Sequence, residues 1–369
     1  MPQSPRLSRS MKPAFLFLFV SLMAGTGCQT LTYYSQAAKG QSQVLLGQKR
    51  ISDMVKDPEV PQKLKDQLTL VLELREFALN ELKMNPEGNY LKYRDLKRKY
   101  VLWVVYAAPP LSVKLKTWWY PIAGKFTSRG FFAEEDARKF ATHLKEQGLD
   151  VYVGGTPAYS TLGWLNDPVL NTFIHYQENN LAELIFHELA HHHLFIKGDA
   201  TFNESFATAV AQIGVAKWLK TKRGTKQRDE YVARCARRYT LSKLLAKNRS
   251  QLKELYTSKK TLSEKREGKK ELIGALKKDL VTLSRSDPAY PKLASWAKRT
   301  VNNAVLGAHS VYHRRVPTFY ALYEQNGQDM KAFLNEIEKI ARMKKKARDS
   351  LLAEHEKKAA TSKLISINN

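Results

Sequence analysis

Cysteine, long apolar runs and acidic residues are all scarce in this chain of 369 residues. Two cysteines, Cys28 and Cys235, cannot build the disulfide framework of a small secreted domain. One apolar run, at the extreme N-terminus, is the only stretch hydrophobic enough to meet a bilayer. Lys and Arg total 61 against 35 acidic residues, and the formal charge of +26 favours nucleic acid or an acidic membrane surface as surroundings. The composition, 43% hydrophobic and 26% charged, excludes collagen-like, low-complexity and wholly disordered chains.

Residues 1–27 have the three-part order of an export signal. Three basic residues come first, an apolar run from Ala14 to Val20 follows, and small residues lead to Cys28. The run is too short to span a bilayer comfortably, which favours a cleaved signal over a transmembrane helix. Its removal leaves a formal charge of +23.

The Gly27-Cys28 pair resembles the bacterial lipoprotein signal, in which the cysteine is lipidated and becomes the first mature residue. In such lipoproteins a residue other than Asp at the next position, here Gln29, usually permits sorting to the outer membrane. We therefore expect a lipid anchor on Cys28 and a periplasm-facing position in the cell envelope, at the outer membrane. The alternative is an ordinary signal peptide with Cys28 as a bystander. Export argues against nucleic acid as a partner, and lipidation of Cys28 leaves Cys235 as the only free thiol.

The hydrophobic periodicity predicts a mainly α chain with a small β-sheet, an α+β fold. β-branched and aromatic residues predict strands at 100–106 and 150–154, and Trp118 and Trp119 lie in a further extended region. Helical spacing predicts helices over 61–83 and 133–147, short helices within 30–60, and helix almost throughout from residue 179.

The composition changes along the chain and suggests six parts. Residues 222–285 are Lys-rich with a thin apolar stripe, which indicates an extended helix or a helical hairpin arm. The parts are a signal peptide at 1–27, an N-terminal helical region at 28–99, a core with strands and helices at 100–221, a basic helical arm at 222–285, a C-terminal helical part of the same core domain at 286–343, and a solvated basic tail at 344–369.

The most informative stretch is His-Glu-x-x-His, from His187 to His191, inside an apolar helical pattern. On a helix these two histidines lie one turn apart on one face, so both imidazoles can reach a single ion. Glu188 is offset by about 100° and can reach a water on that ion without binding the ion itself. His192 points about 100° away from His191.

A catalytic zinc site needs a third protein ligand and an open position for water. Glu204 is the candidate, because a turn at Gly198 followed by an antiparallel helix would return its carboxylate to the two imidazoles. Leu194 and Lys197 occupy the positions at which a third-histidine motif would continue, which favours a glutamate. Taken alone, Glu204 also fits an ordinary acid in the first turn of a helix.

Several segments of the chain, including the motif and the region of Glu204, resemble the predicted zinc aminopeptidase family of Gram-negative bacterial lipoproteins. This family is gluzincin-like. The resemblance implies a zincin-like metallopeptidase, with His187, His191 and Glu204 as Zn²⁺ ligands and Glu188 as catalytic base. The basic helical arm at 222–285 matches the family least and is expected to be an addition to this fold. The matching segments are 27–29, 33–34, 150–155, 159–164, 184–191, 202–208, 302–304 and 316–317.

The expected reaction is hydrolysis of a peptide substrate, with Glu188 activating a zinc-bound water. For the hydrogen bond to the developing oxyanion we select Tyr312, with His309 and Tyr159 as alternatives. Residues 157–164 are expected to lie along the cleft and pair with an extended peptide, and Thr208 is a candidate partner of a ligand.

Two other classes of protein stay open. One is a non-catalytic envelope lipoprotein with a structural or vestigial zinc, whose basic arm contacts anionic lipid or cell-wall polymer. A structural site would have a fourth protein ligand, for which His192 is the nearest candidate. The other is a basic nucleic-acid binder, which requires residence in the cytoplasm and has no supporting motif.

Overall fold

The computed structural model describes residues 28–120, 124–159, 165–287, 290, 293–313 and 315–361. Contacts divide the chain into two units, Met1–Leu46 and Gly47–Asn369. The described part of the first unit is one helix, α2 (Cys28–Leu45), where the sequence suggested shorter ones. Within the described ranges, no helix combines the length and the apolar content needed to cross a membrane.

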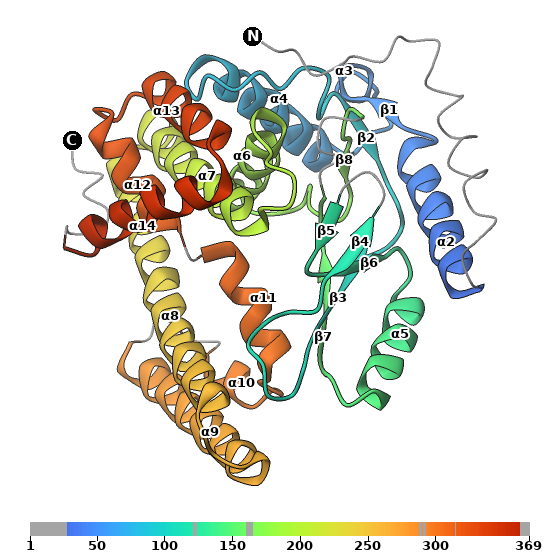
Figure 1. Ribbon diagram of the computed structural model, residues 1–369. Helices are drawn as coiled ribbons and strands as arrows, with labels where there is room; N and C mark the ends of the chain where they lie inside the picture. The colour runs from blue at the N-terminus through green and yellow to red at the C-terminus, as the bar shows by residue number, and fades with distance from the viewer. Residues whose placement is uncertain are drawn as a thin grey trace. The chain divides into compact units, whose positions relative to one another are not determined.

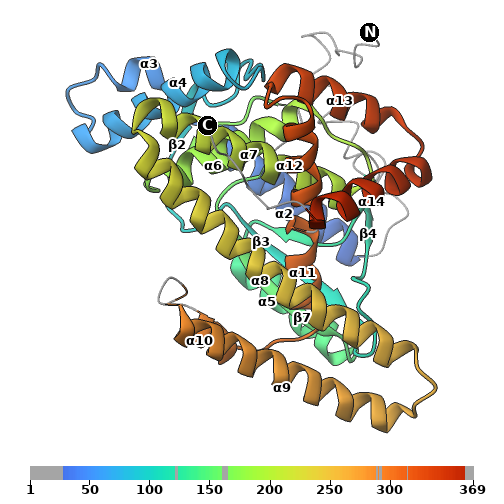
Figure 2. The same cartoon turned by 90° about the vertical axis from the view of Figure 1, so that its left-hand side faces the viewer.

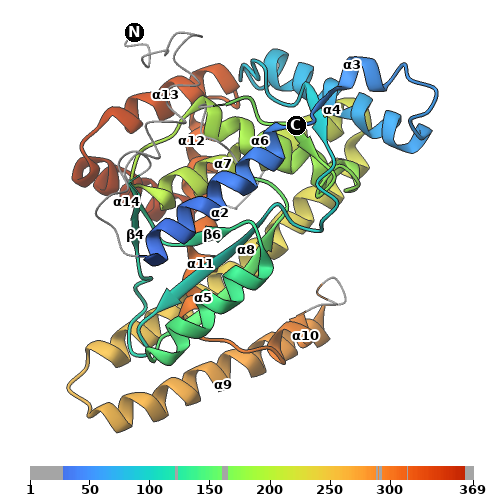
Figure 3. The same cartoon turned by 90° about the vertical axis from the view of Figure 1, so that its right-hand side faces the viewer.

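The larger sheet of the second unit lies between two helices. Its central strand β3 (Leu102–Ala108) pairs antiparallel with β6 (Arg129–Phe131) and β7 (Asp150–Thr156), so the strands expected at 100–106 and 150–154 are confirmed. Helices α5 (Glu134–Glu146) and α11 (Asn303–His313) cover its two faces (Figures 1 and 3). The helix expected over 133–147 matches α5, which ends before Gly148 with a φ of 77°.

Two smaller sheets are built from very short strands. One orders β1 (Lys49–Arg50), β2 (Lys92–Arg94) and β8 (Val169–Leu170), with α3 (Ile51–Met54) directly after β1. The parallel pairing of β2 with β8 brings the loop before β2 to the segment that precedes the motif helix. The other is a hairpin of β4 (Trp118–Tyr120) and β5 (Gly124–Phe126), in the expected extended region.

The helical core is built around α4 (Gln62–Asn80), α6 (Glu178–His193) and α7 (Ala200–Lys222). The helix expected over 61–83 is therefore confirmed, with Pro61 as its N-cap. Helix α7 packs against α6 along its length and is buried on most of its surface. The two helices approach closely at Gly214, where a Cβ atom would lie 2.9 Å from Phe186 and 2.7 Å from Leu82.

The Lys-rich region forms a helical hairpin, one of the two arrangements that its sequence allowed. Helices α8 (Thr225–Thr257) and α9 (Leu262–Ser286) lie side by side and continue into α10 (Leu293–Ala297) (Figure 2). A capping box of Thr261 and Glu264 starts α9. The hairpin has an apolar core and is fastened to the sheet by Lys269, whose Nζ lies 2.7 Å from the carboxylate of Asp150.

The C-terminal segment differs from the expected solvated tail. After α12 (Val316–Gln325) and α13 (Met330–Arg342), residues Lys345–Thr361 form a further helix, α14. Helix α14 packs against α12, with Leu352 fully buried and Arg348 only 3% exposed. Arg348 is buried because its guanidinium pairs with Asp199 at the start of α7, at 2.8 Å. Residues 362–369 lie outside the described ranges.

Candidate metal centre

The His-Glu-x-x-His motif occupies the C-terminal half of α6, as predicted. The rings of His187 and His191 are 4.7 Å apart between centroids and nearly perpendicular. Their Nε2 atoms approach to 3.1 Å. Two ring nitrogens this close can bind one cation between them when both rings are neutral and Nε2 carries no proton.

Glu204 completes the group from the neighbouring helix. Asp199 caps α7 by accepting the N–H of Phe202, and Gly198, with a φ of 79°, makes the turn before it. One turn further, the Glu204 carboxylate lies 3.3 Å from His187 Nε2 and 3.7 Å from His191 Nε2. Ligand atoms of all three residues lie within 4.8 Å of one another, so the group could hold a metal ion.

The donor chemistry fits a zinc ion. Two imidazole nitrogens and one carboxylate are a ligand set that catalytic zinc sites use. The carboxylate charge also governs the protonation of its neighbours. Burial lowers the pKa of His187, but the hydrogen bond and charge of Glu204 outweigh this and leave that pKa above its ordinary value. Burial raises the pKa of Glu204, whereas the hydrogen bonds from His187 and His191 bring it far below the ordinary range, so its carboxylate is ionised.

Glu188 lies beside this group without belonging to it. Its side chain is half-buried, and burial raises the pKa of its carboxyl above the ordinary 4.5. The positive charges of His187 and His191 oppose this rise, while the negative charge of Glu204 adds to it. A carboxyl whose pKa is moved toward neutrality by a water-poor environment is suited to general-base work.

Asn203 fixes the turn between the two ligand-bearing helices. Its side chain is 1% exposed, accepts the N–H of Ile196 at 2.9 Å and donates to the Ile196 carbonyl at 2.8 Å. This pair of bonds holds the loop between α6 and α7 and thereby the start of the helix that carries Glu204. Asn203 lies within the matching segment 202–208, and the sequence alone indicated no role for it.

A second buried network lies on the other side of the motif, and sequence reasoning missed it. His192 Nε2 lies 2.9 Å from the Asp167 carboxylate, and His192 Nδ1 lies 3.4 Å from the Asn89 amide. Asn89 Oδ1 accepts the Asp167 N–H, and the Asp167 carbonyl accepts the N–H of Tyr90. The loop that contains Asn89 is thereby tied to α6. Sequence spacing carries no signal of this network, because Asn89 and His192 are 103 residues apart.

Tyr90 stands close to the motif through this network. Its side chain is 2% exposed, and its backbone has a φ of 58°, unusual for a residue with a Cβ. Burial raises the pKa of its phenol well above the ordinary value, and the charges of Glu188 and Asp167 raise it further. The phenol therefore keeps its proton and stays a hydrogen-bond donor.

The remaining candidates are placed as follows. The backbone of Tyr312 lies in α11, but its side chain lies outside the described part of the structure, as does that of Cys28. The ring of His309 contacts Trp296, and burial lowers its pKa. Tyr159 contacts Phe132, and residues 160–164 of the expected cleft segment lie outside the described ranges. Thr208 is buried on α7, and no hydrogen bond joins it to the three ligand candidates in the described ranges.

Comparisons with known proteins assign a family. A family model described as "Putative aminopeptidase" matches residues 32–352, which is most of the chain. The match includes α6, α7 and the hairpin of α8 and α9. Searches of curated proteins and of solved structures found no match.

Proposed function

The chain belongs to the family described as "Putative aminopeptidase", and from that premise we propose that it is a zinc-dependent peptidase. The supporting observation is the approach of His187, His191 and Glu204 to within 4.8 Å of one another, with Glu188 next to His187 on the same helix. In this proposal the two histidines and Glu204 hold the ion, and Glu188 acts on water.

The chain's own residues divide the work of hydrolysis. When bound, zinc would supply Lewis-acid polarisation of the scissile carbonyl and would lower the pKa of water. Glu188 accepts a proton from the attacking water and delivers it to the leaving amine. Tyr312 is the proposed donor to the developing oxyanion.

A structural zinc in a non-catalytic lipoprotein is the rival proposal. It requires a fourth protein ligand, and His192 was the nearest residue that could supply one. His192 instead pairs with Asp167, and the metal-binding group found in the described ranges has three members. A set of three protein ligands leaves a position for water and substrate, which favours the peptidase.

The test is hydrolysis of a mixed peptide library by the purified protein, with and without a chelator. We expect cleavage that the chelator stops and that added zinc restores, and the products identify which end of the peptide is attacked. Glu188→Gln should bind zinc but not cleave, whereas Glu76→Gln, which changes an exposed glutamate on α4, should behave as wild type. Cleavage by Glu188→Gln at the wild-type rate would remove Glu188 from the mechanism.

We also propose that the chain is exported and anchored to the periplasmic side of the outer membrane by lipid on Cys28. The signal-like residues 1–27 and the Gly27-Cys28 pair support this. In a Gram-negative host, mass spectrometry of the mature N-terminus should find an acylated Cys28. Cys28→Ser should move the protein from the membrane fraction to the soluble one, and an unprocessed N-terminus would contradict the proposal.

The hairpin of α8 and α9 supports a further proposal, contact with anionic lipid or cell-wall polymer. Residues 225–286 carry 18 Lys and Arg against 7 Asp and Glu. Such an excess attracts anionic surfaces and weakens with salt. Co-sedimentation with anionic vesicles or purified cell wall, lost at high salt, is the expected result, and equal binding to neutral vesicles would contradict it.

A further inference from the structure

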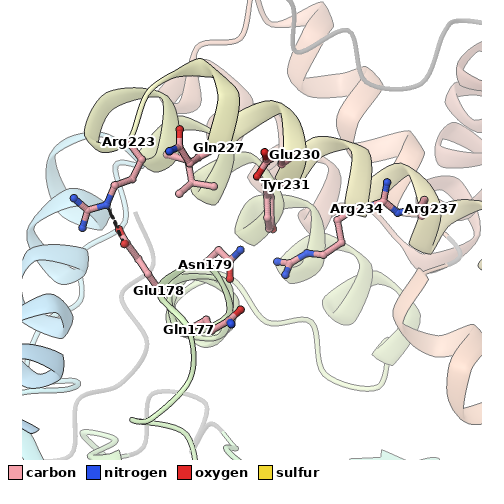
Figure 4. Close-up of a pocket in the computed structure, with 10 residues that line it drawn as sticks. Gln177, Glu178, Asn179, Arg223, Gln227, Glu230, Tyr231, Arg234 and Arg237 are labelled. Carbon is pink, nitrogen blue, oxygen red and sulfur yellow. Dashed lines mark hydrogen bonds and ion pairs between the residues drawn. The ribbon is translucent and has the colours of Figure 1, made fainter. Parts of the chain in front are cut away.

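An open pocket of about 390 Å³ lies between the first turn of α6 and the helices α7 and α8 (Figure 4). Arg223, Arg234 and Arg237 line it, together with the apolar side chains of Leu219 and Tyr231. Its α6 residues end at Asn179, eight positions before the first metal-ligand candidate, or about 12 Å along the helix axis. The pocket is therefore separate from the metal centre, and its role does not depend on the proposed hydrolysis.

The guanidinium of Arg234 lies over the ring of Tyr231, with its Cζ 5.0 Å from the ring centroid, and the side chain is 32% exposed. Its Nε and Nη2 atoms are buried and have no hydrogen-bond partner in the described ranges. The nearest carboxylate, Glu183, lies 3.7 Å away, beyond hydrogen-bond distance. Glu183 is already occupied, because Arg238 donates to both of its oxygens and Tyr231 donates to one of them. Arg234 therefore has no hydrogen-bonded anion within the described ranges, and its partly exposed guanidinium leaves a positive charge at the pocket.

Further donors surround the same space. Arg237 lies one turn after Arg234 on α8, lines the pocket, and has no ion pair with another described residue. The N-cap of α6, Gln177, makes no capping hydrogen bond with its side chain. The backbone N–H groups of Glu178 and Asn179 also lack acceptors in the described part of the chain, as first-turn N–H groups do.

The two acidic residues of the pocket do not fill this need. Glu178 accepts from Trp218 at 2.7 Å and from Arg223 at 3.0 Å. Figure 4 shows its carboxylate turned to Arg223. Glu230 is exposed and makes no ion pair with Arg234 or Arg237. The lining therefore keeps a net positive charge, which comes from Arg234 and Arg237, beside the unpaired N–H groups at the start of α6.

We propose that this pocket binds a phosphate monoester. Guanidinium groups pair with carboxylates and with phosphates, but two of them plus helix N–H groups supply more donors than the two oxygens of a carboxylate accept. The three terminal oxygens of a phosphate ester match this set better. The volume exceeds that of a phosphate, and Leu219 and Tyr231 offer an apolar wall to the esterified group.

The test is calorimetric titration of the full chain with inorganic phosphate and with glucose 6-phosphate, with acetate as the comparison anion. Saturable binding of both phosphates is expected, with acetate at least about tenfold weaker. Arg234→Gln and Arg237→Gln should each weaken phosphate binding about tenfold or more. Arg234→Lys keeps the charge but loses the planar fork, so it should weaken binding as well. Arg266→Gln, which removes an exposed arginine of α9, is the charge-matched control and should bind as wild type.

The results distinguish a soluble phosphate ester from a lipid headgroup, and they also identify the case in which the pocket binds neither. Binding of the soluble esters alone supports a soluble ligand, whereas additional retention on phosphatidic acid vesicles that Arg234→Lys abolishes supports a lipid headgroup. Circular dichroism of each variant identifies loss of folding, and Arg234→Lys provides the comparison if Arg234→Gln does not fold. Absence of saturable binding, equal binding of acetate, or equal weakening by Arg266→Gln would overturn the proposal.

Discussion

Replacing Arg348 tests whether the C-terminal helix α14 is part of the fold. The guanidinium of Arg348 donates to Asp199 at 2.8 Å, to the Met343 carbonyl at 2.9 Å and to the Ala341 carbonyl at 3.3 Å. Arg348→Met would leave the Asp199 carboxylate, itself 4% exposed, with only Lys345 as a cationic partner, at 3.3 Å. The same carboxylate caps α7, so the change reaches the helix that carries the proposed third ligand.

The size of the effect follows from burial. Breaking a buried ion pair by removing one partner costs about 3–5 kcal/mol, because the other charge stays buried. Since Lys345 remains and is more than half exposed, we expect the lower end, about 3 kcal/mol of unfolding free energy. Arg342→Met breaks a comparable pair with Glu338 on the surface and should cost below about 1 kcal/mol.

The pH dependence has a definite sign. Burial raises the pKa of Asp199, but the hydrogen bonds from Arg348 and from the Phe202 N–H outweigh it and leave the folded-state pKa below the ordinary 3.8. The stabilisation is therefore complete above the ordinary pKa and is lost only as the pH falls through the lowered folded-state value. The difference between wild type and Arg348→Met should be constant near neutrality and shrink in strong acid.

Urea unfolding followed by circular dichroism measures these values. The double variant Asp199→Asn, Arg348→Met removes the unpaired charge and should recover part of the loss, since an amide can still accept the Phe202 N–H. If Arg348→Met unfolds within about 0.5 kcal/mol of wild type, the burial of the Arg348–Asp199 pair at the start of α7 is refuted.

Three further predictions concern the helix pair and the site. Gly214→Ala places a Cβ 2.9 Å from Phe186, so it should destabilise the protein by about 1–3 kcal/mol in urea unfolding and weaken metal binding. Gly274→Ala on α9, with open space around its Cβ, should be neutral or stabilise by up to about 1 kcal/mol; equal effects of the two changes would contradict the close α6–α7 contact. Glu188→Gln should lower kcat by about 10²–10⁴-fold while zinc content by elemental analysis stays unchanged, because the amide cannot accept the proton of the attacking water. Glu204→Ala should weaken zinc binding in a competition titration by at least about 100-fold, since even partners outside the ligand set contribute about 10- to 100-fold, and unchanged affinity would remove Glu204 from the site.

The sequence predicted the parts of the site that depend on local spacing. His187 and His191 share a helix face because four residues make about one turn, and Glu204 returns because a glycine turn separates two apolar helices. Both relations lie within a short stretch of chain. The strands at 100–106 and 150–154 and the helix after Pro61 were predictable for the same reason, since periodicity and breakers act over a few residues.

The parts that failed depend on contacts between distant segments. The network of Asn89, Asp167 and His192 exists because β2 pairs with β8. This parallel pairing could not be predicted from the sequence, because β2 has only three residues and β8 only two. The Lys-rich composition of residues 344–369 suggested a solvated tail, yet Arg348 is buried because Asp199 offers a carboxylate. Composition reports the average behaviour of a residue type, whereas burial of a charge depends on one partner elsewhere in the chain.

The most direct test of the central claim is anomalous X-ray scattering from crystals of the zinc-loaded protein, recorded on both sides of the zinc absorption edge. The proposal predicts one zinc peak at about 2.0–2.2 Å from His187, His191 and Glu204, with a non-protein fourth ligand and Glu188 outside the coordination sphere. A peak bound by other residues, a fourth protein ligand, or no zinc peak between α6 and α7 would contradict it.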